Sequence, residues 1–317
     1  MTISIEQGDS FCCQTFADIS MRDLPEPIEI APRLWASKGL PVRPGEHWER
    51  WLGELAFRPL RAALVLTATA NTPGLVINTE LRDKLDLVTI GLVLQGVPRY
   101  RESFLISGAN AAGEAEPRQF SRARVFYPSW NMQPLLVRRT ELERAADLAN
   151  KLEMINRNGE AWRRLRRAID ALTKGSAEYK FQDGRLHDFV RCLEGLIAPA
   201  QGSTRKQFVH RAQTFARASE AARIALGEIY DIRSQTEHLH MPTDPLPGTT
   251  IEEKEALLFK RVRQADVLAR FAVRRVLDEP MLTRTFENDA TIDEFWHQPD
   301  DARVARWGDR LDLDLIA

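Results

Sequence analysis

The hydrophobic positions divide the chain into two parts with different periodicities. Up to about residue 137 the apolar residues form short runs between prolines and glycines, which favours strands and loops. From residue 140 onward they recur every three or four residues, the spacing of amphipathic helices. The pattern predicts a mainly α chain, in which an N-terminal α+β domain precedes a C-terminal antiparallel helical bundle. We place the boundaries at 1–137, 138–285 and 286–317, the last stretch being a short helix or tail.

The N-terminal part contains few long periodic segments. Its first 45 residues are rich in proline and are expected to form an extended arm or short strands. Residues 60–69 are apolar enough for either a helix or a strand, and residues 109–117 have the composition of a loop. The predicted elements are helices at 46–57 and 79–94 and strands at 100–108 and 120–127. Trp48 and Trp51 could stack on bases, but core packing is the plainer interpretation.

The C-terminal part shows helices with start and stop signals. Thr140 and Glu143 fit a capping box, Ser219 fits an N-cap, and Thr249 or Thr250 fits another. Pro280 is expected to end the last long helix. The predicted helices span 140–155, 160–172, 186–197, 204–217, a segment that begins after Ser219, and 251–277.

Composition limits the classes of function. The net charge of the 317 residues is −1, so any nucleic-acid site must be a local patch. Three cysteines (Cys12, Cys13 and Cys192) form no disulfide framework, and a reducing cytoplasm is the expected location. No metal-ligand spacing occurs among the six histidines, so neither a metal nor a cofactor is expected. The first residues lack the pattern of a signal peptide, and the longest apolar run, 62–70, is far short of the roughly 20 residues of a membrane span.

The stretch 228–240 combines groups suited to phosphodiester chemistry. Arg233, Ser234, Glu237, His238 and His240 lie at the end of a predicted helix. An arginine presents a planar fork of donors to a phosphate. A histidine titrates near neutral pH and can transfer a proton. The pair Arg233 and His238 is therefore the candidate catalytic pair.

This stretch resembles the Arg-x4–6-His signature of the HEPN superfamily (higher eukaryotes and prokaryotes nucleotide-binding domains). It is most similar to the ApeA-like branch, whose pattern L-x-x-L-Y-x-x-R-S-x-x-x-H is matched by Leu226, Ile229, Tyr230, Arg233, Ser234 and His238. The upstream L-E-x-L helix of that branch is matched by Leu193, Glu194 and Leu196. The resemblance covers residues 139–280. Two positions depart from the pattern: Ser234 where many active members carry Asn, Asp or His, and Leu239 where glycine often follows the histidine.

The resemblance implies a metal-independent endoribonuclease that acts as a homodimer, with the two motifs paired across one cleft. A toxin or phage-defence effector is the implied biological role. His238 would move a proton at the ribose 2′-OH or the 5′-oxygen, and Arg233 would bind the scissile phosphate. Ser234 would bond the phosphate or orient the histidine. Glu194 would reach toward Arg233, and Tyr230 would offer a platform for a base.

Helix geometry tests the pairing. At 100° per residue, Arg233 and His238 are 140° apart around the axis, whereas Arg233 and His240 are 20° apart. Convergence of Arg233 and His238 requires either a loosened helix near 235–237 or a second subunit. His240 is the fallback partner, because the spacing Arg-x6-His lies within the range of the superfamily.

Plainer roles remain open for the same residues. Arg233 could cap helix carbonyls or pair with Asp231 or Glu237. Glu194 could be a solvated acid, and Tyr230 could be a core residue. The arginine clusters near 163–167, 205–211 and 261–275 are typical of solvated helix faces, although one that faces the motif would help to bind RNA.

Three hypotheses follow from the sequence. The first is a homodimeric, cytoplasmic HEPN-type ribonuclease that binds RNA and has no membrane partner. The second is a non-catalytic HEPN module that binds a nucleotide, RNA or protein partner, and the third is a structural helical scaffold. The sequence assigns no role to residues 1–137.

Overall fold

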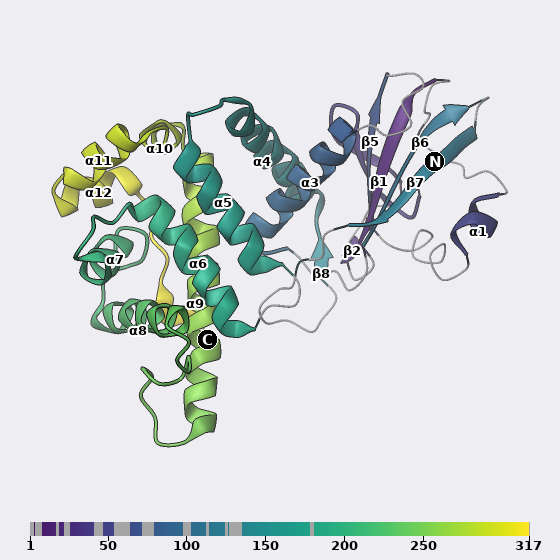
Figure 1. Ribbon diagram of the computed structural model, residues 1–317. Coiled ribbons are helices and arrows are strands. Elements are labelled where there is room, and N and C mark those ends of the chain that lie inside the picture. Colours follow the sequence, from purple (N-terminus) through teal and green to yellow (C-terminus); the bar gives the residue numbers. More distant parts are fainter. Residues whose placement is uncertain are drawn as a thin grey trace. The chain divides into compact units, whose positions relative to one another are not determined.

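The computed structural model divides the chain into two compact units, residues 1–153 and 154–317, which are considered one at a time below (Figure 1). The residues that it describes are 3, 8–16, 19–21, 26–40, 47–53, 64–71, 79–97, 103–111, 114–123, 126, 135–177 and 181–316. The sequence placed a boundary at 137/138, which is where helix α4 (Arg139–Arg157) is about to begin, but most of α4 belongs to the first unit.

The first unit is built on an antiparallel sheet of six strands. The sheet has the order β3-β4-β5-β1-β6-β7, so β1 lies inside the sheet between β5 and β6. Its strands are β1 (Ser10–Phe16), β3 (Ile28–Ala31), β4 (Leu34–Lys38), β5 (Leu64–Ala70), β6 (Phe104–Ala111) and β7 (Glu114–Arg122). A separate parallel pair joins β2 (Ile19–Met21) to β8 (Leu135–Val137).

Both faces of the sheet are covered, so β1 is buried along its whole length. Because side chains alternate along a strand, Cys12 and Cys13 enter different clusters on opposite faces. The Cys12 face packs against α3 (Thr79–Leu94) and α4. On the Cys13 face, α1 (His47–Leu52) inserts Trp48, whose indole N–H donates to the Ala115 carbonyl oxygen at 2.8 Å.

Several expectations for the first unit can now be compared with the structure. The helix at 79–94 is confirmed. The ambiguous segment at 60–69 contributes strand β5, and the expected loop at 109–117 is wrong, because β6 and β7 occupy most of it as a hairpin. Within residues 1–45, β1 is an interior strand and not part of a peripheral arm. The predicted helix at 46–57 is confirmed over α1, while residues 54–57 lie outside the described part.

The second unit is helical. Helix α6 packs against α5, α8 and α9, and α9 is the longest helix (Figure 1). The helices are α5 (Arg163–Ser176), α6 (Gln182–Ile197), α7 (Thr204–Ala212), α8 (Glu220–Glu237), α9 (Ile251–Asp278), α10 (Pro280–Thr285), α11 (Asp289–His297) and α12 (Asp300–Trp307), followed by the 3-10 turn η1 (Leu313–Leu315). Together with the first unit this confirms a chain with an α+β N-terminal part and a helical C-terminal part. No helix in the described part of the chain combines the length and the apolar character that crossing a membrane requires.

Two of the expected caps hold helices at their predicted starts. The Ser219 hydroxyl accepts from the Ala222 backbone N–H at 2.9 Å, and Thr250 forms a capping box with Glu253. The box expected at Thr140 is wrong. Helix α4 begins one residue earlier, and the Arg138 backbone N–H donates to the Glu141 carboxylate at 2.8 Å.

The C-terminal residues form part of the core of the second unit. Helix α7 ends at Ala212 and not at 217, because Arg217 and Phe215 exchange backbone hydrogen bonds with Leu311. Trp307 is fully buried 4.4 Å from the ring of Phe215. The stretch 286–317, which was expected to be a short helix or tail, therefore contains two helices whose aromatic residues are packed inside the unit.

Candidate functional site

Four side chains from α6 and α8 lie around one arginine, Arg233. We call this group the Arg233 cluster: Arg233, Tyr230 and Glu237 from α8, and His187 and Glu194 from α6. The spacing of the residues along each helix explains the arrangement. Tyr230, Arg233 and Glu237 are three and four residues apart, and His187 and Glu194 are seven apart, so each set lies on one face of its helix.

Arg233 is held by two carboxylates. Its Nη1 lies 2.6 Å from Glu237 Oε2, and its Nη2 lies 3.3 Å from Glu194 Oε2. The guanidinium carbon is 5.8 Å from the centroid of the Tyr230 ring. Only 17% of the arginine side chain is exposed, and its Nε is buried without a hydrogen-bond partner among the described residues. The cluster thus holds a partly buried cation that keeps one unused donor.

His187 stands on the other side of Glu237. Its Nδ1 is 4.0 Å from Glu237 Oε1, and the side chain is largely buried. Burial lowers the pKa of His187 from its ordinary value of 6.5, and the positive charge of Arg233 lowers it further. Glu237 opposes both effects without reversing them. His187 is therefore a neutral imidazole near pH 7, beside a fixed positive charge.

Glu194 is shifted in the opposite sense. Burial raises the pKa of its carboxyl above the ordinary value of 4.5, against the attraction of Arg233, and the second carboxylate, Glu237, raises it further. Two acids that share one arginine compete for its charge. A drop in pH would therefore favour protonation of Glu194 and loosen its contact with Arg233.

His238 lies just beyond the end of α8. The helix runs unbroken through Glu237, so the hypothesis of a loosened segment at 235–237 is wrong, and the 140° separation from Arg233 remains. The His238 side chain is exposed and makes no hydrogen bond or ion pair with any residue that the structure describes. Within one chain, the structure brings Arg233 next to His187 and does not pair it with His238.

The turn after His238 explains the positions of its neighbours. The Leu239 N–H donates to the Thr236 carbonyl and the His240 N–H donates to the Gln235 carbonyl, which together form a Schellman motif. Leu239 occupies the left-handed conformation that this motif needs, with φ 61°. The reversal of the chain there is why His240 does not continue the helical face of Arg233. The side chains of His240 and Leu239 are both exposed.

Comparison with known proteins found no similar protein: no protein-family model, no curated protein and no solved structure matches this chain. Among the described residues, no group of three or more His, Cys, Asp or Glu side chains is arranged to hold a metal ion.

The expected supporting residues have mixed outcomes. Glu194 does reach Arg233, and the plain alternative for the arginine, an ion pair with Glu237, is also present. Tyr230 is buried 5.3 Å from the ring of Phe208, which confirms the core interpretation. Ser234 is partly buried on α8, and its hydroxyl has no assigned partner in the described structure.

Asp231, the other carboxylate proposed for Arg233, pairs with Arg205 instead. Arg261 of α9 is bound to Glu228 at 2.6 Å, with both side chains nearly buried. Arg270, on the same helix, is bound to Asp266 at 2.8 Å. These two α9 arginines pair with acids but are largely buried, so the expectation of a solvated helix face is wrong for them.

Sequence reasoning missed His187. The signal that could have found it is its distance of seven residues from Glu194, which leaves the two side chains 20° apart on α6. Arg191 lies between them on the same side. Once Glu194 is expected to face Arg233, the same face of α6 must bring His187 near it.

Proposed function

We propose that the second unit is a HEPN-like endoribonuclease that cleaves RNA without a metal ion, with Arg233 and His238 at the scissile phosphodiester. The observation that carries the proposal is Arg233 itself. Its guanidinium is fixed between α6 and α8, is largely shielded from water, and retains a buried Nε without a partner. Such an arginine can exchange a carboxylate for a phosphate, since both accept the same fork of donors.

The reaction needs one phosphate ligand and at least one group that moves protons. A base takes the proton of the ribose 2′-OH, the 2′-oxygen attacks phosphorus, and the bond from phosphorus to the 5′-oxygen breaks. The 5′-oxygen then receives a proton, leaving a 2′,3′-cyclic phosphate and a 5′-hydroxyl. Arg233 would stabilise the charge that develops on the phosphoryl oxygens, and His238 would carry one proton.

A second copy of the chain would supply the missing convergence. Because α8 stays helical to Glu237, His238 faces away from the arginine of its own chain. Next to it, the side chains of Leu239 and Met241 are 95% and 62% exposed. Exposed apolar side chains of this size favour an interface. A homodimer formed through the helical unit would place the His238 of one copy near the Arg233 of the other, in the cleft that the HEPN resemblance implies.

The test is cleavage of a fluorogenic RNA in EDTA. The wild type is expected to cut, and Arg233→Ala and His238→Ala are expected to lose activity by about 100-fold or more each. Arg223→Ala is the matched control, since Arg223 lies on the same helix and pairs with Glu220 at the surface. Circular dichroism checks the fold of each variant. Full activity of either site variant, or no cleavage by the wild type, would refute the catalytic assignment.

His187 is measured in the same assay because it borders Arg233. A loss in His187→Ala with full activity in His238→Ala would move the proton transfer from the dimer to a single chain. Size-exclusion chromatography with light scattering gives the oligomeric state. A strict monomer that cleaves RNA would contradict the dimeric part of the proposal.

The second candidate is a HEPN module that binds RNA, a nucleotide or a protein without cleaving. One observation favours it: Glu237 and Glu194 already neutralise Arg233. A substrate phosphate would have to displace at least one of them. Binding of RNA by a wild type that produces no cyclic phosphate would support this second function.

A further inference from the structure

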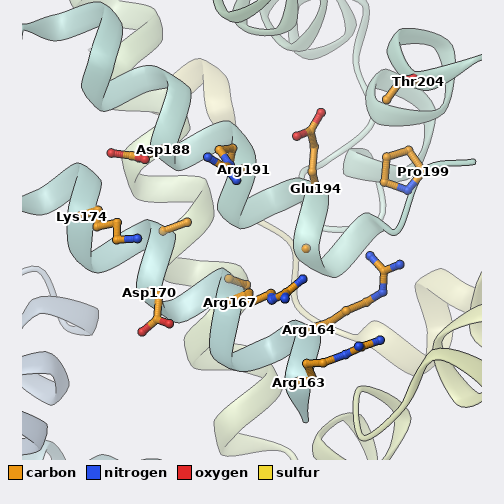
Figure 2. A pocket seen from close by; sticks show the side chains of 13 residues that line it. Arg163, Arg164, Arg167, Asp170, Lys174, Asp188, Arg191, Glu194, Pro199 and Thr204 are labelled. Atoms are coloured by element: carbon orange, nitrogen blue, oxygen red, sulfur yellow. The ribbon is translucent and has the colours of Figure 1, made fainter. Parts of the chain in front are cut away.

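A basic cavity of about 600 Å³ lies between α5 and α6, next to the Arg233 cluster. Figure 2 shows Arg163, Arg164 and Arg167 entering it from α5 and Arg191 from α6. With Lys174 the cavity has five cations, against the three carboxylates of Asp170, Asp188 and Glu194. This local excess of positive charge contrasts with the net charge of −1 of the whole chain.

The five cations differ in how they are held. Arg164 and Arg163 donate to the two oxygens of Asp289, at 2.6 Å and 3.3 Å. Arg167, Lys174 and Arg191 are exposed and have no assigned ion pair within the described part of the chain. These three are therefore available for a ligand, while the Asp289 pair fixes one end of the cavity.

The floor and shape of the cavity indicate the class of ligand. None of the lining side chains is aromatic. The uncharged lining residues are small: Ala168, Ala171, Gly195, Pro199 and Thr204. Without an aromatic ring on which a base can stack, and with five cations in the lining, the cavity favours contacts to phosphates. Arg167 and Lys174 are seven residues apart, which is about 10 Å along α5 at roughly 1.5 Å per residue. That length matches about three nucleotides of a stacked strand at roughly 3.4 Å each.

Glu194 joins this cavity to the Arg233 cluster. Its stem lines the cavity, while its carboxylate points away from α5 in Figure 2 and accepts from Arg233. Arg191 also lines the cavity, and its charge acts on both Glu194 and His187. A strand bound along α5 would thus reach Arg233 by crossing a single helix, α6.

We propose that the cavity between α5 and α6 binds the phosphates of a single-stranded RNA through Arg167, Lys174 and Arg191, and so holds the strand on which Arg233 acts. This inference rests on the proposed function for the identity of the strand. It adds a binding surface within one chain whose three exposed cations contact backbone phosphates, and such contacts carry no base-sequence information.

The magnitude follows from counterion release. Three phosphate contacts contribute about −2 to the slope of log K against log salt for a single strand, or about 20-fold in affinity between 50 mM and 200 mM salt. The variant Arg167→Gln/Lys174→Gln/Arg191→Gln should lose this contribution. The control Lys206→Gln/Lys254→Gln/Lys260→Gln removes the same charge from residues that do not line the cavity, and it should keep most of the slope.

The experiment is a fluorescence-anisotropy titration in EDTA with a labelled 2′-O-methyl oligonucleotide, which cannot be cleaved by attack of its 2′-oxygen. Circular dichroism checks both triple variants. A slope reduced by about 2 in the cavity variant, and nearly unchanged in the control, is the expected result. An equal effect of both variants, no salt-dependent binding by the wild type, or tighter binding of ATP than of the oligonucleotide would overturn the inference.

The two proposals can fail separately. Binding that depends on the three cations, in a protein that never cleaves RNA, would keep the cavity assignment and refute the ribonuclease. Cleavage that depends on Arg233, with the cavity variant as active and as tightly binding as the wild type, would do the reverse.

Discussion

Replacing Leu239 by glycine should make the second unit more stable. Leu239 stands at the left-handed position of the Schellman motif after α8, with φ 61°. An L-residue in this region has its Cβ too close to the neighbouring carbonyl oxygen, whereas glycine has no Cβ. Glycine is the residue that a Schellman motif most often has at this position.

The magnitude follows from three contributions. Relief of the left-handed conformation contributes about 1–2 kcal/mol. The greater freedom of glycine in the unfolded chain offsets about 0.4–1 kcal/mol of this. Loss of the side chain contributes almost nothing, because it is 95% exposed. The expected net gain is about 1 kcal/mol, which raises the midpoint of a unit of this size by about 2–4 °C.

Differential scanning calorimetry is the assay, with the transitions of the two units fitted separately. Leu239→Ala is the matched control, since it shortens the side chain but keeps the Cβ, and it should leave the midpoint nearly unchanged. A glycine variant no more stable than the alanine variant would refute the reasoning about the left-handed turn. A shift in the transition of the first unit would refute it as well.

Three further predictions concern other parts of the chain. Arg233→Ala should lower the free energy of unfolding by about 2 kcal/mol, because Glu194 and Glu237 both lose their cationic partner and Glu237 is only partly buried to begin with. In urea titrations, adding Glu194→Gln should restore part of this stability, and a double variant no more stable than Arg233→Ala would contradict the shared ion pair. The pKa of His187 is lower in the folded chain than in the unfolded chain, so the unfolded chain binds the proton first and stability is lost as the pH falls below about 6.5. Between pH 7.5 and pH 5.5, His187→Gln should therefore lose less stability in urea titrations than the wild type does, and an equal loss would argue against the buried neutral imidazole. Gly91→Ala should destabilise the first unit by about 1–3 kcal/mol, since the new Cβ would lie 2.4 Å from the Ala145 carbonyl oxygen. Helix propensity alone predicts a gain in stability instead, and calorimetry that finds such a gain would show that α3 and α4 can move apart.

Local signals in the sequence predicted the starts of α8 and α9, but not the start of α4 or the end of α7. Ser219 and Thr250 hold the first turns of α8 and α9 through contacts that span three residues, which a sequence displays directly. Pro280 likewise follows the end of α9. The strands were harder, because Cys12 pairs with Ala68 on one side and Ser107 on the other. Such distant partners leave no pattern in a window of ten residues.

The candidate site was predictable up to the point where two helices had to be aligned. The contact between Arg233 and Glu194 was predicted, and the ion pair with Glu237 was one of the alternatives left open for Arg233. The failure of His240 has a local cause, since the helical extrapolation assumes a continuous α8 and Leu239 reverses the backbone. His187 was missed for a different reason: its role depends on which face of α6 meets α8, and only tertiary packing determines that.

The buried cysteines give each unit a natural reporter of its opening. Cys12 and Cys13 are fully buried on an interior strand of the first unit, and Cys192 is fully buried in α6 of the second. Burial raises the pKa of the Cys13 thiol to about 12, so a thiol reagent finds almost no thiolate until the structure opens. Modification of the first pair requires β1 to leave its neighbours, while modification of Cys192 requires α6 to move. Following the two reactions by mass would therefore time the opening of each unit separately, in the unlabelled natural chain.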